Sequence, residues 1–117
     1  MSDKAHNFLN YASFYAQMLP ILRERAKACG YALAIHGSMG RDLDIVAVPW
    51  IEAAVSEEEL VKAIAEVAGC FVPTDHVRES GVIYSNPALK PHGRRAWTVS
   101  WGGHAYIDLS VMARQVG

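Results

Sequence analysis

Two carboxylates separated by one apolar residue constrain this chain more than any other feature of its sequence. Asp42 and Asp44 belong to the segment 42–48, DLDIVAV, whose composition predicts a β-strand. Side chains alternate across a strand, so both charges are expected on one face of the sheet. Two like charges on a partly buried strand are costly unless a cation or an arginine neutralises them. We therefore expect a cation or an arginine beside this pair of aspartates.

The length and composition indicate one folded domain spanning residues 1–117. Hydrophobic residues make up 51% of the chain, which is enough for a core without disulfides. The net charge of −1 argues against binding nucleic acid through bulk charge. No apolar stretch approaches the roughly 20 residues that span a bilayer. Cys29 and Cys70 lack the spacing of a zinc site, and they suggest reduced thiols of a cytoplasmic protein.

The first half of the chain predicts two helices flanking two strands. An apolar stripe predicts a helix over residues 4–28, which Pro20 either kinks or breaks into two. A short strand over 31–36, a tight turn over 37–41 and the acidic strand follow. Ser56 and Glu59 form a capping box that opens a second helix, ending near residue 67 before Gly69. Its expected buried positions are Leu60, Val61, Ile64 and Val67.

The second half is less regular until its end. Residues 71–93 hold three of the five prolines, and only 82–84 suggest a strand, with loops at 86–87 and 90–93. Strands over 94–101 and 104–111 are joined by Gly102-Gly103, a hairpin signal. The expected fold class is therefore α+β: a mixed, largely antiparallel sheet with helices packed on one face.

A third carboxylate, Asp108, lies in the last of these strands. A two-residue turn at Gly102-Gly103 predicts that Trp97 faces Asp108, with Val99 on the same face and Arg95 diagonal to it. Tyr106 and Ser110 would share that face, while alternate residues of the strand point into the core. In the first hairpin, a five-residue turn predicts His36 opposite Asp42 and Ala34 opposite Asp44.

Three aspartates on two strands, facing one side, make an oxygen-rich site for a hard cation. Mg²⁺ or Mn²⁺ bound by Asp42, Asp44 and Asp108 would keep positions open for substrate phosphates. Gly37 and Ser38 supply N–H groups and a hydroxyl suited to a phosphate. Lys90, Arg94 and Arg95 are further candidates to stabilise substrate charge.

These positions resemble the signature of the polymerase-β-like nucleotidyltransferase superfamily. Gly37-Ser38, Asp42-Leu43-Asp44 and Asp108 match it in type and order, over roughly residues 31–111. The resemblance implies divalent-metal-dependent transfer of a nucleotide, with the aspartates as metal ligands, Asp108 as third ligand or base, and Gly37-Ser38 at a nucleoside triphosphate. Only three residues separate Ser38 from Asp42, so the helical turn usual between these motifs is not expected. The chain also resembles small phage and prophage proteins, through segments 41–50 and 90–97, which implies no activity.

Other interpretations of the same residues stay open. Asp42 can be a turn residue, and Asp44 or Asp108 can belong to structural ion pairs with Arg41, Arg94 or Arg95. The segment 90–95 can be an ordinary solvated loop, and the three tryptophans can serve core or subunit packing rather than base stacking. The alternative function is a non-catalytic, phage-type protein of the same fold that binds a protein partner or is structural. An open sheet edge leaves a homodimer open as well.

Overall fold

The computed structural model describes residues 11–69, 88–102 and 105–113. Two α-helices, five β-strands and one 3₁₀ turn lie within these ranges. In chain order they are α2 (Ala12–Ala28), β1 (Tyr31–His36), β2 (Asp42–Pro49), α3 (Glu57–Ala68), β3 (Ala88–Leu89), η1 (Pro91–Gly93), β4 (Arg95–Gly102) and β5 (Ala105–Val111).

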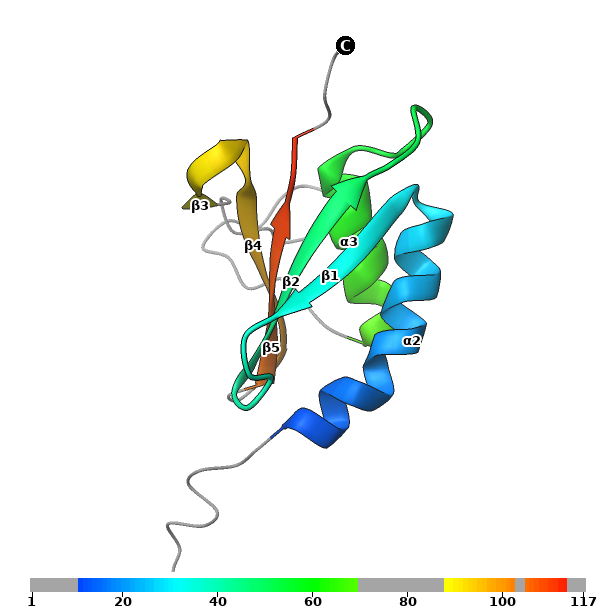
Figure 1. The fold of residues 1–117 in the computed structure, drawn as a ribbon. Coiled ribbons are helices and arrows are strands. Elements are labelled where there is room, and N and C mark those ends of the chain that lie inside the picture. The colour runs from blue at the N-terminus through cyan, green and yellow to red at the C-terminus, as the bar shows by residue number, and fades with distance from the viewer. Residues whose placement is uncertain (1–10, 70–87, 103–104, 114–117) are drawn as a thin grey trace, which may run out of the picture.

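The strands form one sheet in the order β1-β2-β5-β4-β3. β2 and β5 run parallel, and the other three neighbouring pairs run antiparallel. Both helices pack on the same face of this sheet, as Figure 1 shows, with α2 against β1 and α3 against β4. The expected α+β class, with a mixed and largely antiparallel sheet, is therefore confirmed. The latest strand in the chain lies at the centre, between β2 and β4.

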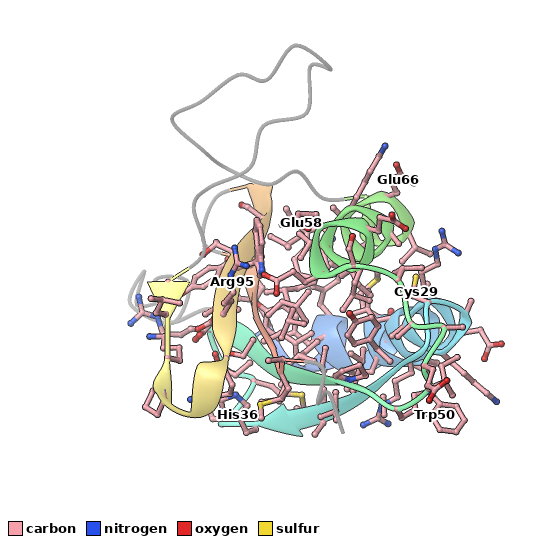
Figure 2. All side chains as sticks on the ribbon, turned by 90° about the horizontal axis from the view of Figure 1, so that it is seen from above. Cys29, His36, Trp50, Glu58, Glu66 and Arg95 are labelled. Atoms are coloured by element: carbon pink, nitrogen blue, oxygen red, sulfur yellow. The ribbon has the colours of Figure 1, made fainter. Side chains whose placement is uncertain are left out.

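The alternation of buried and partly buried residues along β2 and β5 sets the two faces of the sheet. Leu43, Ile45, Ile107 and Leu109 are fully buried towards the helices, whereas the residues between them lie on the other face. Figure 2 shows side chains filling the space between the sheet and the two helices. The core also takes in residues of both helices and of β4: Tyr15, Leu22, Ala26, Leu60, Val61, Ile64, Trp97 and Val99.

The helices follow their sequence signals with two differences. α2 continues through Pro20, so the alternative of two separate helices is wrong; the proline ring lies on the exposed side. The predicted first turns of this helix, residues 4–10, lie outside the described residues. α3 begins as predicted, with the Ser56 hydroxyl accepting a hydrogen bond from the Glu59 N–H at 3.2 Å. Val67 is 37% exposed, so its expected burial is wrong.

Both predicted hairpin registers are wrong, with different consequences. In the first hairpin His36 lies opposite Asp44 and Ala34 opposite Val46, a shift of two residues that leaves each side chain on its predicted face. In the second, an irregularity between Ser100 and Gly102 shifts the pairing, so that Thr98 lies opposite Asp108.

The register shift in the second hairpin places the side chains of Trp97 and Val99 on the face of the sheet opposite to the predicted one. Trp97 pairs with Leu109 and Val99 with Ile107, so both belong to the core instead of sharing a face with Asp108. Gly102 pairs with Ala105, and residues 103–104 lie outside the described ranges. The suggested strand over 82–84 also lies outside them, and the sequence does not predict β3. None of the described helices is both long and apolar enough to cross a membrane.

Candidate metal centre

The first two carboxylates are placed by the pleat of β2. Leu43 and Ile45 point into the core, which turns Asp42 and Asp44 to the opposite face of the sheet. Both aspartates are partly buried. The expectation that they share one face is therefore confirmed.

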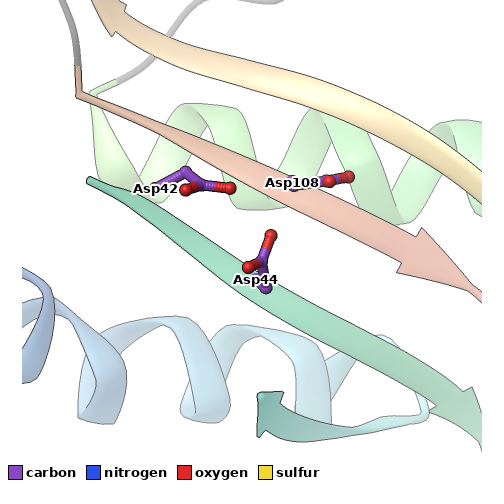
Figure 3. A group of neighbouring side chains, drawn as sticks. All are labelled: Asp42, Asp44 and Asp108. Atoms are coloured by element: carbon purple, nitrogen blue, oxygen red, sulfur yellow. The ribbon is translucent and has the colours of Figure 1, made fainter. Parts of the chain in front are cut away.

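The third carboxylate reaches them because β5 is the parallel neighbour of β2. Asp108 is the register partner of Asp44, and Tyr106 is the register partner of Asp42. One carboxylate oxygen from each aspartate lies within 4.8 Å of one from each of the others. Figure 3 shows the three side chains converging between the two strands. The structure thus brings Asp42, Asp44 and Asp108 into one acidic cluster.

Burial and neighbouring charges change the ionisation of Asp44. The pKa of Asp44 is raised to about 6, chiefly by burial, which penalises the charged form. A hydrogen bond that the protonated Asp44 carboxyl donates to the Asp42 side chain acts in the same direction, as do the negative charges of Asp42 and Asp108. His36, its register partner on β1, acts in the opposite direction. Burial and the acidic cluster likewise raise the pKa of the Tyr106 hydroxyl.

No arginine in the described ranges forms an ion pair with the acidic cluster. Among the described residues, the ion pair within 4.0 Å joins Arg95 to Glu57, with 3.0 Å between Nε and Oε1, and none involves the three aspartates. The predicted alternative of an Asp108–Arg95 pair is wrong, because these side chains leave the sheet on opposite faces. The three carboxylates therefore face one another without an ion pair to any lysine or arginine of segments 11–69, 88–102 and 105–113.

Gly37 lies against the acidic cluster. Its φ of +76° is a left-handed conformation, and a Cβ on it would stand 2.8 Å from the Asp44 carboxylate. Ser38 lies in the same exposed turn, where its hydroxyl accepts a hydrogen bond from the Gly40 N–H at 3.3 Å. The turn contains no helix, as its length predicts. The structure therefore places the Gly-Ser turn next to the carboxylates.

The other candidate basic residues lie elsewhere. Arg95 points from β4 towards α3, where it pairs with Glu57 and lies 5.8 Å over the Trp97 ring (Figure 2). Its register partner on β5 is three residues beyond Asp108, roughly 10 Å along the strand at its usual rise. Arg94 donates from Nε to the Pro91 carbonyl at 3.3 Å.

Lys90 is exposed at the start of η1. The structure does not bring these three cations to the acidic cluster.

The tryptophans divide between core and surface. Trp97 is buried, and its indole N–H donates to Glu57 at 3.1 Å. Trp101 packs edge-on against Phe14 and donates to the Ala68 carbonyl at 2.7 Å. Trp50 is 60% exposed in the turn after β2. Packing thus accounts for two of the three.

Sequence reasoning missed two residues beside the acidic cluster. Tyr15, buried on α2, donates its hydroxyl proton to the Arg41 carbonyl and accepts a hydrogen bond from the Tyr106 N–H at 3.4 Å. The sequence predicts His36 opposite Asp42, whereas it lies opposite Asp44. No local signal identifies Tyr15, whereas a correct hairpin register would have identified His36.

The donor set fits a divalent cation. All three side chains offer carboxylate oxygens, which Mg²⁺ and Mn²⁺ prefer, and the negative charges of Asp42 and Asp108 add to burial in raising the pKa of Asp44. Three side chains leave coordination positions for water or for a phosphate. Comparison of the sequence with models of protein families and with curated proteins found no match.

Proposed function

We propose that the protein is a divalent-cation-dependent nucleotidyltransferase or nucleotide-binding protein. The observation that carries the proposal is the convergence of Asp42, Asp44 and Asp108 within 4.8 Å on two parallel neighbouring strands. Gly37 and Ser38, which precede the first aspartate in the resembled signature, lie in the turn against Asp44. Order in the chain and position in space therefore support the same interpretation.

Each residue has a distinct role under this proposal. Asp42 and Asp44 hold the cation, and Asp108 is either a third ligand or the base that accepts the proton of an attacking hydroxyl. The backbone N–H groups of Gly37 and Ser38 bind a phosphate oxygen. Mg²⁺, when bound, neutralises the negative charge that develops during phosphoryl transfer.

Charge alone makes the order of binding predictable. A triphosphate approaching three carboxylates is repelled, and no described lysine or arginine side chain forms an ion pair with these carboxylates. Triphosphate should therefore bind only together with a divalent cation. Cation alone should bind to the acidic cluster.

The first experiment measures thermal unfolding with Mg²⁺, with a nucleoside triphosphate, and with both. A ligand present at 100 times its Kd stabilises the native state by about 2.7 kcal/mol, or roughly 10 °C for a chain of this size. We expect the largest rise with both ligands and no rise with triphosphate alone. Equal Tm values under all conditions would contradict nucleotide binding.

The second experiment titrates Mn²⁺ by calorimetry into the wild type and into Asp42→Asn/Asp44→Asn. The double variant should remain folded and lose measurable affinity, because it removes two of the three anionic ligands. A matched control is Glu58→Gln/Glu66→Gln, which removes the same charge from exposed positions of α3. Retained affinity in the aspartate variant, or lost affinity in the control, would count against the proposed site.

A non-catalytic protein of the same fold is the second candidate, and one observation favours it. The turn from Gly37 to Arg41 has no helix, so it lacks the set of N-terminal N–H groups with which helices bind phosphate. Cation binding without any further effect of triphosphate would favour this candidate, in which the acidic cluster and its ion are structural or contact a partner protein.

A further inference from the structure

The start of α2 is fastened to the strands that carry the acidic cluster. Tyr15 is fully buried, and its hydroxyl lies between two backbone groups: the carbonyl of Arg41, to which it donates, and the N–H of Tyr106, from which it accepts at 3.4 Å. Arg41 immediately precedes Asp42 on β2, and Tyr106 lies two residues before Asp108 on β5. One phenol oxygen therefore bridges the two strands.

The bridge lies at the end of the parallel β2–β5 pair, next to an irregular part of the β4–β5 pairing. Asp42 and Tyr106 are the first register partners of the parallel pair. On the other side of β5, the pairing with β4 is irregular between Ser100 and Gly102, next to the Ser100–Tyr106 pair. Strand ends open more readily than strand centres. A fixed hydrogen-bonding group at this end limits how far β2 and β5 can separate.

Packing holds the phenol in place. Its ring lies 5.9 Å from that of Tyr11, 5.8 Å from that of Phe14 and 5.8 Å from that of Trp101. The Tyr11 N–H also donates to the Gly40 carbonyl at 2.9 Å, which attaches the same end of α2 to the turn before β2. Because the Tyr15 ring is buried, its hydroxyl has a fixed position relative to the two backbone groups that it bonds beside β2 and on β5.

We propose that Tyr15 is a positioning residue for the cation site, setting the separation of Asp42 from Asp108 through the backbone of β2 and β5. This inference rests on the proposed function, because it assigns Tyr15 an effect on the affinity of the acidic cluster for a cation. Tyr15 does not touch the ion. Its hydroxyl acts by holding the ligand-bearing strands at one spacing.

The test compares Tyr15→Phe with Tyr31→Phe. Each variant removes one hydroxyl that donates to a backbone carbonyl from a buried tyrosine; Tyr31 donates to the Val55 carbonyl at 2.7 Å, at the other end of β1. Mn²⁺ affinity is measured by calorimetry, and the urea midpoint is measured without metal. We expect the urea midpoint to fall in both variants. The Kd for Mn²⁺ should rise only in Tyr15→Phe, by about tenfold, which is typical of removing a group that orients metal ligands without touching the ion.

Each outcome has one meaning. A wild-type protein that binds no Mn²⁺ refutes the proposed function itself. A wild type that binds, with an unchanged Kd in Tyr15→Phe, overturns the positioning role alone. Equal losses of affinity in both tyrosine variants also overturn it, because general destabilisation then explains the result.

If Tyr15→Phe does not fold, hydrogen exchange of the wild type decides. By reciprocity, Mg²⁺ should slow exchange of the Tyr106 N–H more than that of the Trp50 N–H, which bonds to Gly30 far from the acidic cluster. Equal slowing at both sites would overturn the role.

Discussion

Replacing Asp44 with asparagine should make the metal-free protein more stable at neutral pH. The wild-type carboxyl has a pKa of about 6, raised by burial and by Asp42 and Asp108. In the unfolded chain an aspartate ionises near pH 3.9. Between these two values the folded state holds a proton that the unfolded state has released, so the free energy of unfolding falls as pH rises from about 4 to about 6.

The magnitude follows from the two pKa values. Their difference corresponds to at most about 3 kcal/mol. Because the side chain is only partly buried, water screens part of this interaction, and we expect about 1–2 kcal/mol. Asp44→Asn cannot ionise, so it should exceed the wild type by that amount at pH 7.5 and lose the advantage at pH 4. Adding Mg²⁺ should remove most of the wild-type deficit.

The assay is urea unfolding, followed by tryptophan fluorescence, in metal-free buffers from pH 4 to pH 8. Glu52→Gln is the control, since it removes an exposed carboxylate in the turn after β2 and should follow the wild type within about 0.5 kcal/mol. Identical pH profiles for wild type and Asp44→Asn would refute the reasoning. A loss of about 3–5 kcal/mol in Asp44→Asn at pH 7.5 would instead indicate a buried ion pair.

Two further substitutions test neighbouring features. Gly37→Ala should weaken Mn²⁺ binding, because its Cβ would stand 2.8 Å from the Asp44 carboxylate; Gly69→Ala has a similar φ of +71° with nothing within 4 Å, and should cost about 1 kcal/mol of stability without changing the Kd. Equal Kd values in both alanine variants would contradict the contact. Arg95→Gln should cost less than about 1 kcal/mol and leave stabilisation by Mg²⁺ and triphosphate unchanged, since this arginine pairs with α3. Loss of that stabilisation would assign Arg95 to the substrate.

The parts of the site that depend on strand alternation are predictable from sequence. Asp42 and Asp44 share a face in any register, because residues two apart always do. The error in the first hairpin amounts to two residues, so it changes the neighbour of Asp44 from Ala34 to His36 without moving any side chain across the sheet.

The parts of the site that depend on a register shift by an odd number of residues are not predictable from the sequence. The irregularity between Ser100 and Gly102 has no local signal beyond the glycines, yet it turns Trp97 and Arg95 to the helix side. Trp97, which a two-residue turn would place opposite Asp108, is part of the core. The Tyr15 bridge is likewise a tertiary contact, 91 residues from Tyr106 in the chain, and no periodicity indicates it.

The position of β5 at the centre of the sheet affects how the protein acquires its acidic cluster during synthesis. β2 and its hairpin partner emerge from the ribosome early, but the strand that completes the cluster follows about 60 residues later and must insert between β2 and β4. A nascent or truncated chain ending before Ala105 therefore carries two carboxylates without their third. The complete cluster can therefore form only after β5 has been synthesised and has paired with β2.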